Sequence, residues 1–177
     1  RDVFVFSCYT GLSYIEVKNL KQCDIVNGID DEQWIMVRRQ KTKTPVKLPV
    51  LDEAKAILEK YADYPSEENN YSLLRMFSDQ KINKNLKKIA ELCNIKKNLT
   101  FHVARHTFAT TIALLNDVPI ETVSKILGHT KLSTTQKYAR VIEKKISSDM
   151  TKLKTKLKNS KKEQNYKPTV HDHLKIV

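Results

Sequence analysis

The sequence predicts an α+β fold that is mainly α-helical, with a small β-hairpin or three-stranded sheet. The chain has 177 residues, 40% of them hydrophobic, which is enough for one domain with a buried core. Its three glycines and five prolines are too few for a sandwich built from many tight turns, and this favours helices. Two short apolar runs joined by a polar turn predict the hairpin.

The N-terminal part opens on a short apolar run, Val3–Tyr9, which ends at Thr10-Gly11. No methionine precedes this run, so we expect the chain to be a fragment of a longer protein. The next segment, Ser13–Leu20, repeats apolar residues at helical spacing and is expected to be a helix.

The hairpin follows. Gln33–Arg39 contains a run of apolar residues and is expected to be a strand, Lys41–Pro45 a polar turn with a basic tip, and Val46–Val50 the second strand. Asp52 is expected to begin a helix that reaches about Tyr61.

Two longer helices are expected in the middle of the chain. Ser78 or Asp79 is expected to cap a helix that runs to about Cys93. Its inner stripe consists of apolar residues at three- and four-residue steps: Ile82, Leu86, Ile89, Ala90 and Cys93. Thr100 is expected to cap the next helix, His102 to about Leu115.

Two short helices are expected after that. Pro119–Leu127 has proline in its first turn, and Gly128 can end it in a left-handed conformation. Ser133 with Gln136 three residues later predicts a capping box that opens the helix carrying Tyr138.

The C-terminal part is rich in lysine. Glu143–Lys162 is expected to be an amphipathic helix, because its apolar residues share one face: Ile146, Met150, Leu153 and Leu157. Asn165–Val177 is expected to be an extended arm with an apolar end, which suits docking on a partner.

Charge and cysteine content narrow the class of protein. With 32 basic and 20 acidic residues the formal net charge is +12, so a phosphate polyanion is the expected partner. Cys8, Cys23 and Cys93 lack metal-ligand spacing and are expected to be buried, reduced thiols of a cytoplasmic protein. No stretch approaches the ~18 apolar residues of a membrane span, and no membrane partner is expected.

One spaced set of residues points to phosphodiester chemistry. His102 and Arg105 are three residues apart and share a helix face, and His129 and Tyr138 follow. Such residues supply cations for phosphate, proton carriers and a phenol that can attack phosphorus to form a covalent ester. His106, in the same motif, is expected to be a structural residue that forms hydrogen bonds within the core.

These residues lie in text that resembles the tyrosine recombinase family of phage integrases and Xer- and Cre-like enzymes. The resembling stretches are YTGLSYIEVKNL (9–20), RRQKTKTPVKLPV (38–50), FHVARHTFATTIALL (101–115) and ILGHTKLSTTQKYARV (126–141). They occur in the family's order and cover nearly a whole catalytic domain. The resemblance implies the tyrosine recombinase catalytic-domain fold, and the hairpin resembles that of integrases of Bacteroides-type mobile elements.

The resemblance also implies roles for individual residues. Tyr138 matches the nucleophile that forms a 3′-phosphotyrosine. Arg105 matches an arginine that holds the scissile phosphate, and His129 a residue that donates a hydrogen bond to it.

Three further positions match supporting residues of the family. His102 matches a residue that assists proton transfer at the tyrosine, Lys41 the hairpin lysine that protonates the leaving 5′ oxygen, and Glu16 an acidic buttress. No metal or other cofactor is implied.

One position departs from the pattern, since the family places a catalytic arginine where this chain has Ser13. Losing such a donor commonly costs ~10²–10³ in rate. Arg39 shares a strand face with Lys41, and we hypothesise that it replaces the missing arginine. The alternatives are that Arg39 is a solvated strand residue and that the protein is a degenerate, inactive DNA binder.

The expected function is therefore a site-specific DNA recombinase, or integrase, that integrates or excises a mobile element. We expect residues 1–141 to be the catalytic core and 142–177 a helix and arm exchanged between subunits. The N-terminal DNA-binding domain is expected to be missing from this fragment. The alternatives are a type IB topoisomerase-like enzyme and a non-catalytic DNA-binding regulator.

The expected partner is double-stranded DNA, on which the protein forms a homotetramer, with the isolated fragment a monomer. Accessory DNA-bending proteins and a location at the bacterial nucleoid in the cytoplasm also follow from the resemblance.

Overall fold

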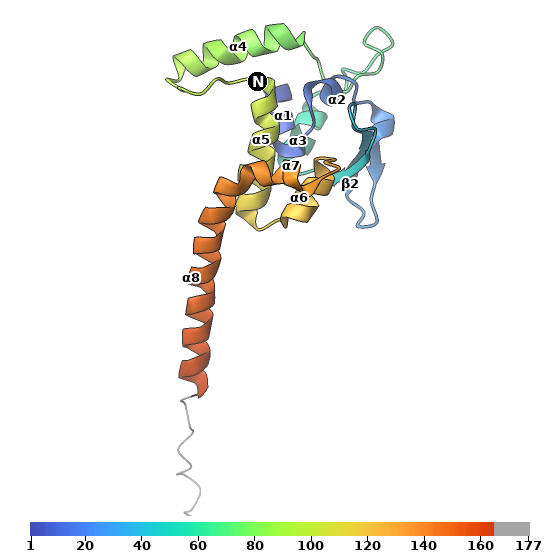
Figure 1. The fold of residues 1–177 in the computed structure, drawn as a ribbon. Helices are drawn as coiled ribbons and strands as arrows, with labels where there is room; N and C mark the ends of the chain where they lie inside the picture. The colour runs from blue at the N-terminus through green and yellow to red at the C-terminus, as the bar shows by residue number, and fades with distance from the viewer. Residues whose placement is uncertain (165–177) are drawn as a thin grey trace, which may run out of the picture. The chain divides into compact units, whose positions relative to one another are not determined.

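The computed structural model describes residues 1–164, and side chains within 1–138 and 146–159. The chain divides into two compact units, the first being Arg1–Ala139 and the second beginning at Arg140. The first unit combines short helices with one small sheet (Figure 1), in agreement with the predicted α+β class.

The first helix, α1 (Asp2–Thr10), contributes to the core. It buries Phe6 completely and packs against α3 (Asp52–Lys60) and α5 (Phe101–Thr107). Gly11, at a φ of 66°, ends it in the left-handed region that glycine adopts at little cost. A Cβ at Gly11 would lie 2.7 Å from the Phe108 ring, so the chain passes very close to the next segment here.

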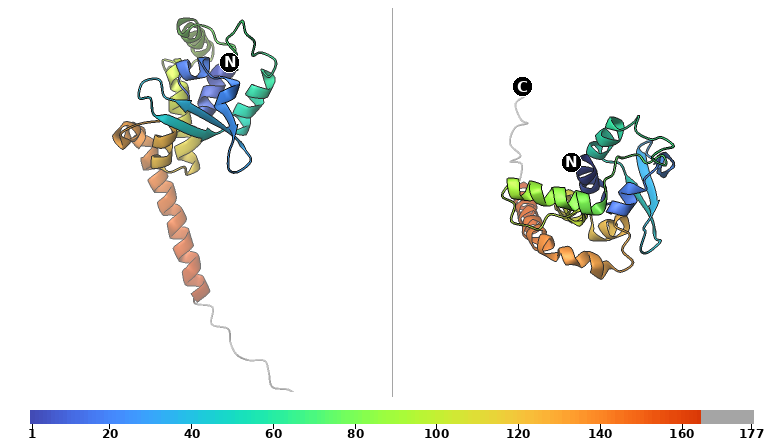
Figure 2. Two further views of the ribbon diagram at one scale, coloured as in Figure 1. Left: turned by 90° about the vertical axis from the view of Figure 1, so that its right-hand side faces the viewer. Right: turned by 90° about the horizontal axis from the view of Figure 1, so that it is seen from above.

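The sheet is antiparallel in the order β1-β2-β3 and consists of β1 (Ile25–Asn27), β2 (Gln33–Arg38) and β3 (Pro45–Pro49). The predicted hairpin is therefore present, and β1 adds the third strand. Alternation decides which side is buried, because Ile35 and its partner Leu48 face the core whereas Lys47 is exposed. Figure 2 shows the sheet along one side of the helices.

The helix α4 (Asp79–Leu92) begins at the predicted cap, where the Lys81 backbone N–H donates to Ser78 Oγ at 3.3 Å. Its buried residues are Ile82, Leu86 and Ala90. Ile89 is 43% exposed and Cys93 is exposed, so the predicted inner stripe was too wide. The helix packs on α5 with its buried residues, and the flanks of the predicted stripe lie in solvent.

The helix expected from His102 to Leu115 is interrupted. After α5 the chain forms a π-helical turn, η2 (Phe108–Ala113), and then a 3₁₀ turn, η3 (Leu114–Asn116). Thr100 precedes α5 without capping it by its side chain; the Phe101 backbone N–H instead donates to Asn83 Oδ1 of α4 at 2.7 Å.

Two short helices and a turn lead to the tyrosine. α6 (Ile120–Ile126) is followed by Leu127 and then by Gly128, whose φ of 62° agrees with the predicted left-handed stop. The predicted capping box is wrong, because Ser133 lies inside α7 (Leu132–Thr135) and the 3₁₀ turn η4 (Gln136–Tyr138) follows directly. Tyr138 is therefore on a tight turn rather than within a helix.

The long helix α8 (Ala139–Gln164) runs without interruption from this turn. The predicted apolar stripe along it is 45–56% exposed at Ile146, Met150, Leu153 and Leu157. The arm expected at residues 165–177 lies outside the described residues. Among the described helices, none is long and apolar enough to cross a membrane.

The cysteines correct another expectation. All three are free, but only Cys8 is buried, whereas Cys23 and Cys93 are exposed. Cys8 lies on the core side of α1, and burial raises the pKa of its thiol to about 11.

Candidate active site

Two arginines meet at the C-terminal end of α6. Arg39 Nη2 donates to the carbonyl oxygen of Ile126, and Arg105 Nη2 donates to that of Leu127. Arg105 Nη1 donates to the Gly11 carbonyl oxygen at 2.7 Å. The last carbonyls of a helix have no partner within it and carry partial negative charge, so they favour cations. This end of α6 therefore collects positive charge from two distant parts of the chain.

Arg39 reaches this point from the hairpin, one residue beyond β2. Its backbone N–H donates to the Thr44 oxygen at 2.9 Å, which continues the ladder by one pair and directs the side chain inward. The side chain is only 4% exposed, and its Nε is the one fully buried side-chain polar atom without a partner among the described residues. Gly128 makes room for it, because a Cβ there would lie 2.5 Å from Arg39 Cγ.

Glu16 holds Arg39 from the other side. Its carboxylate accepts a hydrogen bond from Arg39 Nη1 and another, at 2.8 Å, from the Ser13 backbone N–H. Burial alone would raise the pKa of Glu16, but the Arg39 charge and the Ser13 hydrogen bonds outweigh it, so the pKa lies below its ordinary value. Ser13 directly precedes α2 (Tyr14–Lys18) as its N-cap and contacts the site through Glu16.

Arg105 lies in a more crowded electrostatic environment. Burial and the nearby Arg39 charge lower its pKa to about 10, against the opposing effects of Glu16 and Tyr138. The guanidinium therefore stays protonated at neutral pH, so two positive charges lie close together.

His129 follows Gly128 and contacts both Arg105 and α7. Its Nε2 is 3.4 Å from Arg105 Nη2, and its Nδ1 is 2.8 Å from the hydroxyl oxygen of Thr135. Burial, then the charges of Arg105 and Arg39, lower the pKa of His129 to about 4, so the ring is neutral at pH 7.

Tyr138 is 8% exposed, and its ring meets the His106 ring edge-on at a centroid distance of 5.1 Å. Burial raises the pKa of its phenol, and the Arg105 charge partly offsets this. His106 in turn meets the His102 ring at 5.2 Å. His106 is exposed and does not form the core hydrogen bonds expected of it; it lies between His102 and the tyrosine.

His102 and Lys41 lie at the exposed edge of the site. Burial and the charges of His106, Arg105 and Lys41 lower the pKa of His102. Lys41, at the hairpin tip, is thus close enough for its charge to act on His102.

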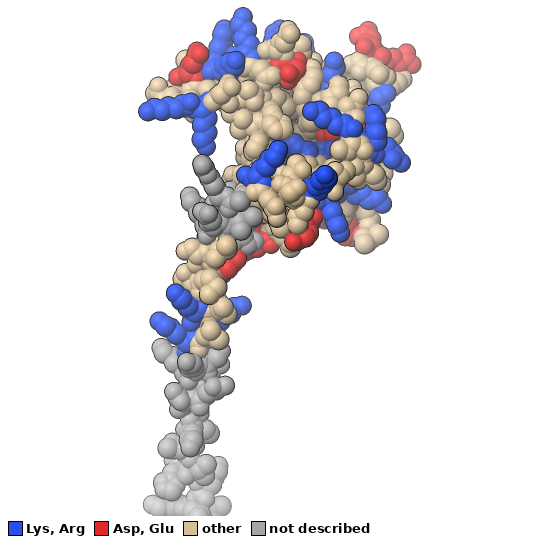
Figure 3. Space-filling model, viewed as in Figure 1, with Lys and Arg blue, Asp and Glu red and all other residues tan. Residues whose placement is uncertain are grey.

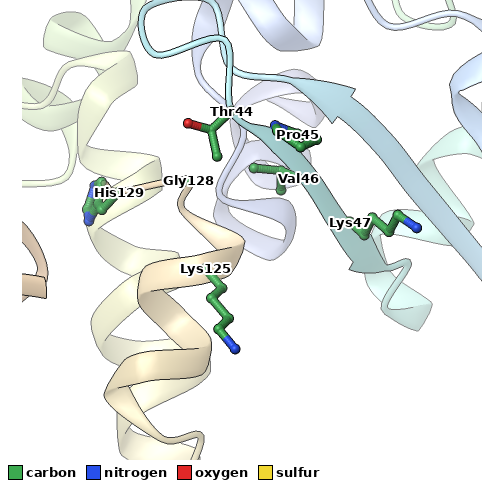
Figure 4. A pocket seen from close by; sticks show the side chains of 7 residues that line it. All are labelled: Thr44, Pro45, Val46, Lys47, Lys125, Gly128 and His129. Atoms are coloured by element: carbon green, nitrogen blue, oxygen red, sulfur yellow. The ribbon is translucent and has the colours of Figure 1, made fainter. Parts of the chain in front are cut away.

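A surface pocket of about 360 Å³ opens beside this cluster, between β3 and the end of α6. It is lined by Thr44, Pro45, Val46, Lys47, Lys125, Gly128 and His129. Figure 4 shows Lys47 and Lys125 extending from the side of the pocket away from His129. The pocket thus joins two exposed cations to the cluster.

Most of the residues singled out in the sequence come together. Buried Glu16, Arg39 and Tyr138 form one cluster with half-buried Arg105 and His129. His102 and Lys41 lie at its edge, and Ser13 lies behind Glu16. Thr135 and the contact of His106 with the tyrosine were not predicted from the sequence. The position of Thr135 between His129 and Tyr138 of the motif is the feature of the sequence that could have indicated it.

Comparisons with known proteins identify the family of the chain. The phage integrase family model matches residues 1–145. Tyrosine recombinase XerD of Listeria monocytogenes is 33% identical over 144 residues, which are 75% of this chain and 46% of the relative. Tyrosine recombinase XerA of Thermococcus onnurineus is 32% identical over 149 residues, 80% of this chain and 50% of the relative. The chain thus spans about half the length of the curated relatives it matches.

Solved structures show the same fold. A crystal structure of XerA recombinase has a TM-score of 0.65 at 25% identity, over 84% of this chain and 61% of that one. The catalytic domain of bacteriophage HP1 integrase has a TM-score of 0.55 at 25% identity, over 79% and 73%. With its tyrosine, arginines and histidines gathered at one site on this fold, the chain belongs to the phage integrase family.

Proposed function

We propose that the chain is the catalytic domain of a tyrosine-type site-specific DNA recombinase. The observation that carries this is the pair of adjacent guanidinium groups, Arg39 and Arg105, beside a buried tyrosine. Arg39 Nε is a buried N–H without a partner, and a buried donor of this kind is costly unless a ligand satisfies it. A phosphate oxygen is the acceptor that best suits an arginine pair.

In the proposed reaction, Tyr138 Oη bonds to the scissile phosphorus as the bond to the 5′ oxygen breaks. The products are a 3′-phosphotyrosine and a free 5′-hydroxyl. The 5′-hydroxyl of a partner strand then displaces the tyrosine, so the number of phosphodiester bonds is unchanged and no nucleotide hydrolysis is needed. The two arginines stabilise the charge that develops on the phosphoryl oxygens.

Proton transfer falls to the residues at the edge of the site. His102 has a lowered pKa and is neutral at pH 7, so it can accept the phenol proton. In the structure the His102 ring contacts His106, and His106 contacts Tyr138. Direct proton transfer therefore requires His102 to move toward Tyr138 when DNA binds. Lys41 is the proposed acid for the leaving 5′ oxygen.

Arg39 takes the place of the arginine that the family has at position 13. Three contacts support this: Glu16 and the Ile126 carbonyl orient the guanidinium, and Gly128 leaves space for its stem. Glu16 also binds the Ser13 backbone, so Arg39 is anchored where an arginine at position 13 would begin. A solvated strand residue would be neither buried nor paired.

DNA is the proposed partner. A structurally similar XerH recombinase (TM-score 0.65) has been solved bound to difH DNA, and the Tn1549 transposon integrase (TM-score 0.57) with transposon right end DNA. The net charge of +12 fits a polyanion, and Figure 3 shows basic side chains, in blue, projecting where α4 lies. The lysines in the sequence of α4 are Lys81, Lys84, Lys87 and Lys88.

Assembly into a tetramer on DNA, with residues 142–177 exchanged between subunits, is part of the same proposal. The exposed apolar stripe on α8 supports it, because such a stripe favours a protein partner. Accessory DNA-bending proteins and a location at the bacterial nucleoid complete the proposal. The proposal also includes an N-terminal DNA-binding domain in the whole protein.

Covalent trapping tests the function. The full-length protein is incubated with nicked duplexes from the ends of the element that encodes it, and adducts are separated on a denaturing gel. We expect an adduct that is absent in Tyr138→Phe and formed ~10²–10³ times more slowly in Arg39→Ala. Arg38→Ala is the matched control, since Arg38 is the exposed neighbour on the hairpin.

Two results would contradict the proposal. DNA binding without any adduct, especially if Ser13→Arg restores one, identifies a regulator whose catalytic site has decayed. Relaxation of supercoiled DNA without exchange between partner sites identifies a topoisomerase-like enzyme.

A further inference from the structure

Thr135 is a buried polar residue next to a proposed ligand of the phosphate. It is the last residue of α7, it is fully buried, and its hydroxyl oxygen is 2.8 Å from His129 Nδ1. A buried hydroxyl costs free energy unless it is hydrogen-bonded, so this contact matters to both groups. It also links two residues of one short segment, since Thr135 lies six residues after the histidine and three before Tyr138.

The contacts of the ring decide which nitrogen carries the proton. A guanidinium only donates hydrogen bonds, so His129 Nε2, 3.4 Å from Arg105 Nη2, must present its lone pair. The ring is neutral at pH 7, because its pKa is lowered by burial and by the charges of Arg105, Arg39 and Lys137. The single proton is then on Nδ1, which donates to Thr135 Oγ1.

We propose that Thr135 is a positioning residue that holds His129 as the Nδ1–H tautomer, with the Nε2 lone pair toward Arg105. This assignment concerns the free protein and rests on the two contacts of a neutral ring. Its consequence for the reaction rests on the proposed function.

That consequence is a change in what His129 does when phosphate arrives. In the free protein Nε2 has no proton to give, so His129 accepts a hydrogen bond rather than donating one. When Arg105 turns to a phosphate oxygen, Nε2 takes up one proton from solution and donates it in a hydrogen bond to the phosphate. Nδ1–H stays on Thr135, whose hydroxyl oxygen stabilises the charged ring.

The tautomer is measured directly by ¹⁵N NMR of the histidine side chains in the full-length protein at pH 7, without DNA. A ring nitrogen that carries a proton resonates far upfield of one that does not, and His129→Gln identifies the His129 signals. We expect Nδ1 of His129 to be protonated and Nε2 to be unprotonated. A protonated Nε2 would overturn the proposal.

Three variants test the role of Thr135. Thr135→Val keeps the shape but removes the hydroxyl, so the His129 signals should move toward the average of two exchanging tautomers. Thr135→Ser should restore them, and Thr134→Val, at the half-buried neighbour, should leave them unchanged. Wild-type signals in Thr135→Val would contradict the proposal; if that variant does not fold, the wild-type assignment still decides the tautomer.

Covalent trapping with the same variants connects the contact to chemistry. At unchanged DNA affinity, Thr135→Val should form the adduct on the order of tenfold more slowly, and Thr135→Ser near the wild-type rate. If His129 has the stated tautomer but neither the wild type nor any variant forms an adduct, the proposed function fails and the tautomer assignment stands. If the adduct forms but Nε2 is protonated, this inference alone fails.

Discussion

The orientation of the Arg39 side chain could be predicted from the sequence, but its contacts could not. Alternation along the strand predicted that it would face the site with Lys41, and the side chain does point inward. The reason for its placement was not visible, because Glu16 comes from α2, and Ile126 and Gly128 come from the end of α6. Lys41 itself is exposed at the tip, since the turn begins before it.

The ionisation of His129 predicts how stability depends on pH. Folding lowers its pKa from 6.5 to about 4, so between these pH values the unfolded chain binds a proton that the folded chain does not. Stability therefore falls as pH drops from 6.5 toward 4, and His129→Gln should remove that part of the fall. Melting temperatures from pH 7 to pH 4 measure it, with a difference of a few degrees between the two proteins expected at pH 4.5.

The control for that measurement is His106→Gln, on an exposed ring. If wild type and His129→Gln lose melting temperature in parallel over the whole range, His129 is not neutral in the folded protein.

At the scale of the element, helix ends were easier to predict than helix interiors. Gly128 and Ser78 act locally, and both predicted boundaries are correct. The break after Thr107 and the exposure of Ile89 depend on how the helices pack, which no spacing of apolar residues encodes. The capping box at Ser133 failed because a tight turn at the tyrosine outweighs a local side-chain preference.

Gly11 gives a prediction for the first helix. Gly11→Ala adds a Cβ in the left-handed region and against the Phe108 ring, so we expect a loss of about 2–3 kcal/mol in the free energy of unfolding. Urea denaturation measures the loss. The substitution should also disturb the position of the Arg105 side chain, because the Gly11 carbonyl oxygen accepts its hydrogen bond.

A surface substitution such as Lys131→Ala provides the comparison, and should change stability by less than about 0.5 kcal/mol. A similarly small change for Gly11→Ala would mean that the contact with Phe108 relaxes freely.

At the scale of the whole molecule, the sequence predicted the fold class and the family, because four motifs in one order are carried by a single domain. It predicted the members of the site better than their contacts. Those contacts need the hairpin, α5 and α6 to meet in three dimensions, and residues distant in the chain supply them.

The apolar stripe on α8 gives a prediction about assembly. Leu153, 45% exposed, should enter a partner surface when the protein assembles on DNA. Leu153→Glu should weaken that assembly by at least about tenfold, because the charge must be desolvated, while DNA binding by the single protein persists. Gel mobility and light scattering on DNA measure the two separately.

Lys154→Ala is the matched change on the same helix. An equal loss of assembly in both variants would indicate charge on the helix rather than its apolar stripe as the cause.

The segment from Gly128 to Tyr138 carries two residues of the proposed site, His129 and Tyr138. The tyrosine lies at one end, the histidine at the other, and Thr135 fastens the histidine to the middle. Because of this contact, we expect a movement of Tyr138 toward or away from a bound phosphate to shift His129 as well. In the proposed reaction, withdrawing the nucleophile would thus also withdraw a phosphate ligand, and both would return together.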